Sequence, residues 1–186
     1  MQVDARSGRL WQAQWLPSPN FDARPPQQVP QLGVIHGISL PPGQFSGQAI
    51  IELFSNRLNP AQHDYYRHLM DLRVSSHLLI RRDGELIQFV DFNQRAWHAG
   101  ASSYQGRSRC NDFSIGIELE GMDTEPYGEA QYQVLAQVMQ ALETAYPQLQ
   151  DWVGHSEIAP GRKTDPGPSF DWAYLNEHRL NLSARV

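Results

Sequence analysis

The stretch Ser114-Ile115-Gly116-Ile117-Glu118-Leu119 alternates apolar side chains with small or polar ones. A period of two is typical of a β-strand, because successive side chains in a strand point to opposite faces of the sheet. One face of this strand is therefore predicted to be apolar, with Glu118 on the other. A carboxylate there has two interpretations: it faces solvent, which suits Glu120 next along that face, or it serves a site.

Three further segments are predicted to be strands, at 32–36, 77–82 and 85–91. The Asp83-Gly84 pair between the last two indicates a hairpin, since this dipeptide fits the turn that joins antiparallel strands. The connection 37–76 is long, polar and interrupted by proline and glycine. Such a connection is either a lid or binding loop, or an ordinary surface excursion that contains a helix.

The clearest predicted helix covers 128–145, where apolar residues recur at steps of three and four and Pro147 ends the pattern. Shorter helices are expected at 47–57 and after Asp171, whose carboxylate can cap a helix. Strands and helices together predict an α/β fold, with a mixed β-sheet flanked by helices. We expect residues 1–186 to form a single domain.

Length, composition and charge limit the classes of protein to which the chain can belong. Its 186 residues are 40% hydrophobic, and it carries a net charge of −5 without a basic block. Nucleic-acid binding is therefore not expected. The N-terminus lacks the apolar core of a secretory signal and no run is long enough to span a membrane, so we expect a cytoplasmic protein without membrane association. The lone Cys110 is interpreted as a small core residue.

The most chemically diverse segment is 154–167, which reads Gly-His-Ser-Glu-Ile-Ala-Pro-Gly-Arg-Lys-Thr-Asp-Pro-Gly. Its prolines and glycines are expected to exclude a regular helix. Pro166 favours an extended backbone at Asp165, and side chains two residues apart in an extended chain point to the same side. Lys163 and Asp165 are therefore expected to face one spot, in the same loop as His155.

Two histidines and an aspartate form a candidate set of metal ligands. His36 lies at the end of the predicted strand 32–36, and His155 and Asp165 lie in the loop. Three protein ligands with one open position are typical of catalytic zinc, whereas structural zinc sites have four ligands and are rich in cysteine. On spacing alone, the alternative is that the three residues are unrelated positions at a strand end and in a loop.

Several motifs occur in the order found in one enzyme family, and together they resemble cytosolic N-acetylmuramoyl-L-alanine amidases of the AmpD type. The resemblance runs from about Pro17 to Trp172. One departure is Gly37, because the family commonly has asparagine after its first zinc histidine. The motifs are Val34-Ile35-His36 with the following Ile38–Gly43, then Arg81–Gly84, Arg95–Gly100, Cys110–Gly121 and the 154–167 loop.

The resemblance implies an α/β fold of the N-acetylmuramoyl-L-alanine amidase type, in which His36, His155 and Asp165 hold Zn²⁺. It also implies that Glu118 is the general base for the attacking water, and that Lys163 stabilises the oxyanion together with zinc. Taken without the resemblance, Glu118 also fits a solvent-facing strand position, and Lys163 fits an ordinary surface lysine.

Substrate contacts are implied for three further residues. Arg73 and Arg109 match family arginines that bind carboxylates of the stem peptide, a task that suits the guanidinium fork. Trp97 would offer an aromatic face to the sugar or peptide. Taken alone, the arginines fit surface positions and Trp97 fits core packing. His98 either lines the cleft or has a structural role.

The activity implied by the resemblance is hydrolysis of the amide bond between (1,6-anhydro)N-acetylmuramic acid and the L-alanine of a stem peptide, in peptidoglycan recycling. The substrate would be an anhydromuropeptide, and we expect a monomer. One alternative is a non-catalytic peptidoglycan-recognition module on the same fold, against which the presence of Glu118, Lys163 and a full ligand set argues. The other is a phage or secreted wall-degrading amidase, whose secreted form would need a signal sequence.

Overall fold

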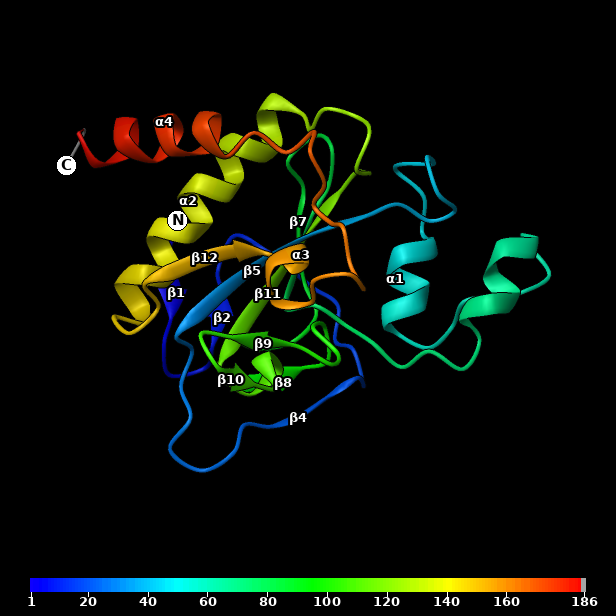
Figure 1. The fold of residues 1–186 in the computed structure, drawn as a ribbon, viewed down its shortest axis with the longest axis horizontal. Coiled ribbons are helices and arrows are strands. Elements are labelled where there is room, and N and C mark those ends of the chain that lie inside the picture. The colour runs from blue at the N-terminus through cyan, green and yellow to red at the C-terminus, as the bar shows by residue number, and fades with distance from the viewer. Residues whose placement is uncertain (185–186) are drawn as a thin grey trace.

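The computed structural model describes residues 1–184, which are built around a six-stranded mixed β-sheet (Figure 1). The first four strands in the order below are mutually parallel, the fifth is antiparallel to the fourth, and the sixth is parallel to the fifth. The order across the sheet is β12 (Asp151–Gly154), β5 (Leu32–Ile38), β11 (Ser114–Glu120), β6 (Leu78–Ile80), β7 (Leu86–Gln88) and β3 (Gln14–Trp15).

Short antiparallel strand pairs and helices surround this sheet. The pairs are β1 (Val3–Asp4) with β2 (Arg9–Leu10), β4 (Phe21–Ala23) with β8 (Gln94–Ala96), and β9 (Ser103–Tyr104) with β10 (Arg107–Ser108). The helices are α1 (Ala49–Phe54), α2 (Glu129–Ala145), α3 (His155–Ile158) and α4 (Trp172–Ser183), with 3-10 turns at Asp64–Leu69 and Cys110–Asp112. Within residues 1–184, none of the helices combines the length and hydropathy needed to cross a membrane.

Helices cover both faces of the sheet, as buried parallel strands require. α2 and α4 pack together on one face, and α1 lies on the other side (Figure 1). On the first face, Ile115, Ile117 and Leu119 of β11 join the apolar stripe of α2 in a hydrophobic cluster. On the opposite face, Leu79 and Ile87 pack with α1. Burial of each such side chain contributes about 1.5–3 kcal/mol against the entropy cost of folding.

Most of the predicted elements are confirmed, some with shorter bounds. The hairpin between β6 and β7 is present, and Gly84 occupies its turn with φ of +89°. α2 begins directly after Gly128, and α4 is capped by Asp171, whose carboxylate accepts a hydrogen bond from the Tyr174 amide at 2.9 Å. The helix predicted over 47–57 is shorter and covers only α1.

Several short elements differ from the prediction. Strands β3 and β12 of the main sheet and the strands of the three outer pairs were not predicted, because two to four residues are too few to show a periodic pattern. The segment 154–167 was expected to exclude a regular helix, and this is wrong for its first turn, which forms α3. Pro160 lies beyond that turn and so does not disturb it, while the Glu157 carboxylate accepts a hydrogen bond from the Gly154 amide at 2.8 Å and caps the helix start.

Every residue of β11 is buried, so the solvent-facing interpretation is wrong for the polar face of this strand. Glu120 is only 1% exposed. Its carboxylate accepts hydrogen bonds from the Ser46 amide at 2.6 Å, from the Arg82 amide at 3.3 Å and from Arg81 Nη1 at 3.4 Å. The alternation of the sequence is real, but helices and loops cover both faces of a sheet of parallel strands.

We expect Glu120→Ala to lower the free energy of unfolding by about 3 kcal/mol, because Arg81 would lose its buried partner and keep only the half-exposed Glu85, and two backbone amides would lose their acceptor. Urea unfolding measures the change. Glu125→Ala is the matched control, since Glu125 is exposed and its loss should cost less than about 0.5 kcal/mol. Equal stability of the two variants would contradict the role assigned to Glu120.

Candidate metal centre

The sheet brings the three predicted metal ligands together. His36 lies near the end of β5, and His155 follows β12, whose Gly154 pairs with Ile35 of β5. His36 Nδ1 lies 2.9 Å from His155 Nδ1 and 3.2 Å from Asp165 Oδ2, and His155 Nδ1 lies 3.0 Å from the same oxygen. A tetrahedral ion bound at about 2.0–2.1 Å would separate its ligand atoms by about 3.3 Å, so these atoms fit one ion.

The protonation states of these residues also suit a metal. Burial lowers the pKa of His36 to about 4, so its imidazole is neutral at physiological pH. Burial alone would raise the pKa of Asp165, but the adjacent imidazoles of His155 and His36 outweigh it and hold that pKa below its ordinary range. Neutral imidazole and ionised carboxylate are the forms that bind metal.

The triad borders a cleft of about 820 Å³ that also contains most of the other predicted site residues. Arg109 is the exception among them: it is exposed outside the lining of this cleft, and its Nε pairs with Asp112 at 3.3 Å. Arg73 is on the cleft wall and donates to the carbonyl groups of Met70 and Leu72. Tyr65, which is not among the predicted site residues, also lines the cleft. The predicted residues that line it are His36, Arg73, Trp97, His98, Glu118, His155, Lys163 and Asp165.

Glu118 borders the same cleft and differs from its neighbour on the strand face in having no polar partner. It is 9% exposed, and its Oε2 is buried without a hydrogen bond from any described residue. Burial raises the pKa of this carboxyl well above its ordinary value; the charge of Asp165 adds to the effect and Lys163 opposes it. Burial of a carboxylate without a hydrogen-bond partner destabilises the folded state. Such groups are typical of catalytic sites.

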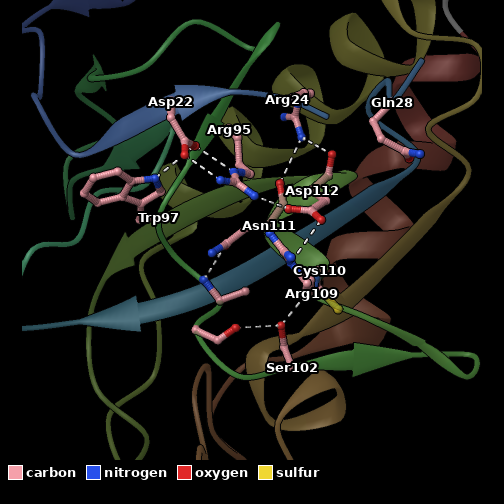
Figure 2. A network of polar contacts seen from close by, with 12 residues as sticks. Asp22, Arg24, Gln28, Arg95, Trp97, Ser102, Arg109, Cys110, Asn111 and Asp112 are labelled. Atoms are coloured by element: carbon pink, nitrogen blue, oxygen red, sulfur yellow. Dashed lines mark hydrogen bonds and ion pairs between the residues drawn. The ribbon is translucent and has the colours of Figure 1, made fainter. Parts of the chain in front are cut away.

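A network of polar contacts beside the cleft was not predicted from the sequence (Figure 2). Arg95 binds the carboxylates of Asp22 and Asp112 at 2.5 Å each. Asp22 also accepts a hydrogen bond from Trp97 Nε1 at 3.1 Å, and Asp112 pairs with Arg109. Trp97 and Arg109, both predicted to bind substrate, are thus held by one charge network. No sequence pattern links Asp22 to the others, because β4 reaches them only through its pairing with β8.

Gly37 departs from the residue common in the family, and the structure shows what occupies the space beside it. A Cβ atom built on Gly37 would lie 2.2 Å from the Tyr127 hydroxyl oxygen. Tyr127 donates a hydrogen bond to the Pro166 carbonyl at 2.9 Å and so braces the residue after Asp165. In this chain, a side chain at position 37 would therefore require Tyr127 to move.

Comparison with known proteins finds one family that matches most of the chain. A model of the N-acetylmuramoyl-L-alanine amidase family matches residues 26–168. The 1,6-anhydro-N-acetylmuramyl-L-alanine amidase AmpD of Citrobacter freundii is 59% identical over 167 residues, which are 89% of this chain and 89% of the relative.

Solved structures agree with that match. The crystal structure of a selenomethionine AmpD derivative superposes with a TM-score of 0.93 at 56% identity, covering 96% of this chain and 99% of the other. The amidase AmiD of Escherichia coli, solved with anhydro-N-acetylmuramic acid-L-Ala-D-γ-Glu-L-Lys, is more distant, with a TM-score of 0.58 at 28% identity over 83% of this chain and 60% of that one. The mixed sheet with flanking helices is the fold predicted from the sequence.

We expect Glu118→Gln to raise the melting temperature of the metal-free protein by about 2 °C or more, the shift that 1 kcal/mol gives at this chain length. The raised pKa of Glu118 means that the ionised carboxylate destabilises the folded state at neutral pH, and a neutral amide removes that cost. The difference should vanish below about pH 4, where the carboxyl is protonated in both the folded and unfolded states. Thermal melts at pH 7 and pH 4 test this, and a lower melting temperature at pH 7 would refute it.

Proposed function

The chain belongs to the N-acetylmuramoyl-L-alanine amidase family, and we propose that His36, His155 and Asp165 hold the zinc ion of this enzyme. Its reaction is hydrolysis of the amide bond between 1,6-anhydro-N-acetylmuramic acid and L-alanine, in peptidoglycan recycling. One observation carries the metal assignment: a ligand atom of His36 and two from the distant 154–167 segment lie within 3.2 Å of one another beside a cleft.

The donor set favours zinc among the common metals. Two imidazole nitrogens and one carboxylate oxygen, with a position left open to the cleft, are a typical catalytic zinc set. Bound zinc supplies Lewis acidity, which polarises a carbonyl group and makes water a better nucleophile. Hard cations such as Mg²⁺ and Ca²⁺ prefer sets made of oxygen alone.

Glu118 is the residue best placed to move the protons of the reaction. Its unpartnered Oε2 can accept a proton from the attacking water. Because its pKa is raised, the carboxyl can hold that proton and then deliver it to the leaving amine of L-alanine. Lys163 lines the cleft on the loop of Asp165, and its ammonium group supplies positive charge to the oxyanion that develops on the carbonyl.

Substrate recognition is assigned to Trp97, Arg73 and Arg109. Trp97 is held by Asp22 with its indole bordering the cleft, which suits contact with the sugar or peptide. Arg73 on the cleft wall and Arg109 outside it would bind carboxylates of the stem peptide, Arg109 from its position on Asp112. The substrate of this proposal is an anhydromuropeptide, and the fragment bound by AmiD supports that class. One domain over residues 1–186, a monomeric state and a cytoplasmic location are part of the same proposal.

Purified protein is expected to bind about one zinc ion per chain, as a single three-ligand site requires. His36→Ala and His155→Ala should each lower the zinc content sharply, measured by atomic emission after dialysis against a metal buffer. His63→Ala is the control, because His63 is exposed in the 3-10 turn region far from the triad in sequence. Full zinc content in both triad variants would refute the ligand assignment.

Removal of Glu118 or Lys163 should separate metal binding from catalysis. We expect Glu118→Gln to keep its zinc and to hydrolyse an anhydromuropeptide at least about 10²-fold more slowly, as loss of a general base usually causes. Lys163→Ala should also lower kcat, because it removes charge that matters most in the transition state. Mass spectrometry of the products measures both rates.

Two outcomes would count against these roles. A parent protein that binds the substrate without cleaving it would be a recognition module. A Glu118→Gln variant close to the parental rate would show that another group is the base, and Tyr65 and His98 would be the next residues to test.

A further inference from the structure

The Nε2 atoms of both proposed metal histidines contact the same short segment of chain. His36 Nε2 lies 2.9 Å from His98 Nδ1, and His155 Nε2 lies 3.3 Å from the carbonyl oxygen of Ala99. Two neighbouring residues thus place one potential acceptor beside each imidazole, at the ring nitrogen that is not turned toward Asp165. Neither His98 nor Ala99 belongs to the proposed ligand set, and these two contacts were not predicted from the sequence.

The acceptors decide which nitrogen of each imidazole can bind metal. A neutral imidazole carries one proton, and an acceptor at Nε2 holds the proton there and leaves the Nδ1 lone pair free. The carbonyl of Ala99 can only accept, so it fixes His155 in this form. His98 can do the same for His36 only if its own Nδ1 is unprotonated, which requires that its proton be on Nε2.

Strand β11 supplies the groups that hold His98 in that form. His98 Nε2 lies 3.0 Å from the hydroxyl oxygen of Ser114, which can accept a hydrogen bond from a protonated Nε2. Gly116, two residues further along the same face, makes room for the ring: a Cβ atom there would lie 2.4 Å from His98 Cγ. Ser114 and Gly116, the small residues of the alternating strand pattern, therefore form a seat for the His98 imidazole.

Asn111 holds the backbone of the same segment. Its Oδ1 accepts hydrogen bonds from the His98 amide at 3.2 Å and from the Ala99 amide at 2.8 Å. Two converging N–H donors require an oxygen at this position, which settles the orientation of the side-chain amide. Arg162 adds a hydrogen bond from Nη2 to the Ala99 carbonyl at 2.7 Å. Asn111 therefore fixes the backbone of both residues, and Arg162 also holds the Ala99 carbonyl.

We propose that His98 and Asn111 are positioning residues of the metal centre, which present the Nδ1 atoms of His36 and His155 to one ion. The proposal rests on the proposed function, because it takes these two histidines as ligands. His98 itself is not a ligand in this arrangement. His98 contacts Nε2 of His36. The other nitrogen of that ring, Nδ1, lies beside His155 Nδ1 and Asp165 Oδ2 and is the proposed ligand atom.

Paired substitutions at His98 test the acceptor itself. His98→Leu removes it, and zinc affinity measured by competition with a chelator should fall by about 10–100-fold, the usual cost of losing an outer-shell partner. His98→Asn places an amide oxygen close to the position of Nδ1 and should retain affinity within about threefold of the parent. Equal affinity of His98→Leu and the parent would overturn the proposal, as would equal losses in both variants.

Asn111 is tested in the same way. Asn111→Ala should lower zinc affinity by about 10-fold, and Asn111→Asp, which keeps an oxygen acceptor, should restore most of it. Asn93→Ala is the matched control, since Asn93 also ties loops together, through hydrogen bonds to the Ala5 carbonyl and from the Tyr146 hydroxyl. A merely structural role for Asn111 would give Asn111→Ala and Asn93→Ala the same unchanged affinity, which would overturn its assignment.

Nitrogen-15 spectra of the zinc-bound protein provide a second readout that does not depend on activity. The parent should show His36 and His155 with the proton on Nε2, and His98→Leu should broaden or shift the His36 signal and leave that of His155 in place. A parent that binds no zinc at His36 and His155 would defeat the proposed function itself. A parent that binds zinc there, with the His36 signal unchanged in His98→Leu, would defeat only the present proposal.

Discussion

The parallel pairing of β5 with β11 places His36 directly opposite Glu118. Paired residues of neighbouring strands point to the same face, so this register sets the first imidazole and the proposed base side by side. β12 pairs with the free side of β5, and His155 follows that strand at once. A slip of one residue in the β5–β11 register would turn either Glu118 or His36 toward the face that α2 covers, and the site would be lost.

The same face of β11 shows how neighbouring polar residues acquire different tasks from their surroundings. Ser114 and Gly116 seat the His98 ring, Glu118 faces the cleft without a partner, and Glu120 is tied to Arg81 and two backbone amides. Only Glu120 has its charge satisfied by the fold. The strand therefore combines support for the proposed metal ligands, the proposed catalytic carboxyl group and a structural anchor at successive positions of one face.

The sequence was enough to predict the main strands, the long helix and the three residues that meet at the candidate metal site, because alternation, helical periodicity and family motifs are local signals. It did not reveal β12, whose few residues carry no period, or the one-turn α3 before Pro160. Nor could it distinguish Glu118 from Glu120, since both occupy the same strand face and differ only in partners brought by distant loops. The acceptors behind the metal histidines depend on contacts of the same long-range kind.

The strand order also governs when this enzyme can mature as it is synthesised. β5 leaves the ribosome early, yet both of its neighbours in the sheet, β11 and β12, are encoded in the last half of the chain. Until they arrive, the nascent β5 has two unpaired edges and no partner for His36. Non-local pairing of this kind folds slowly and exposes apolar strand edges meanwhile. The set of His36, His155 and Asp165 can therefore assemble only after β12 and the loop that follows it have been synthesised, well after β5 itself.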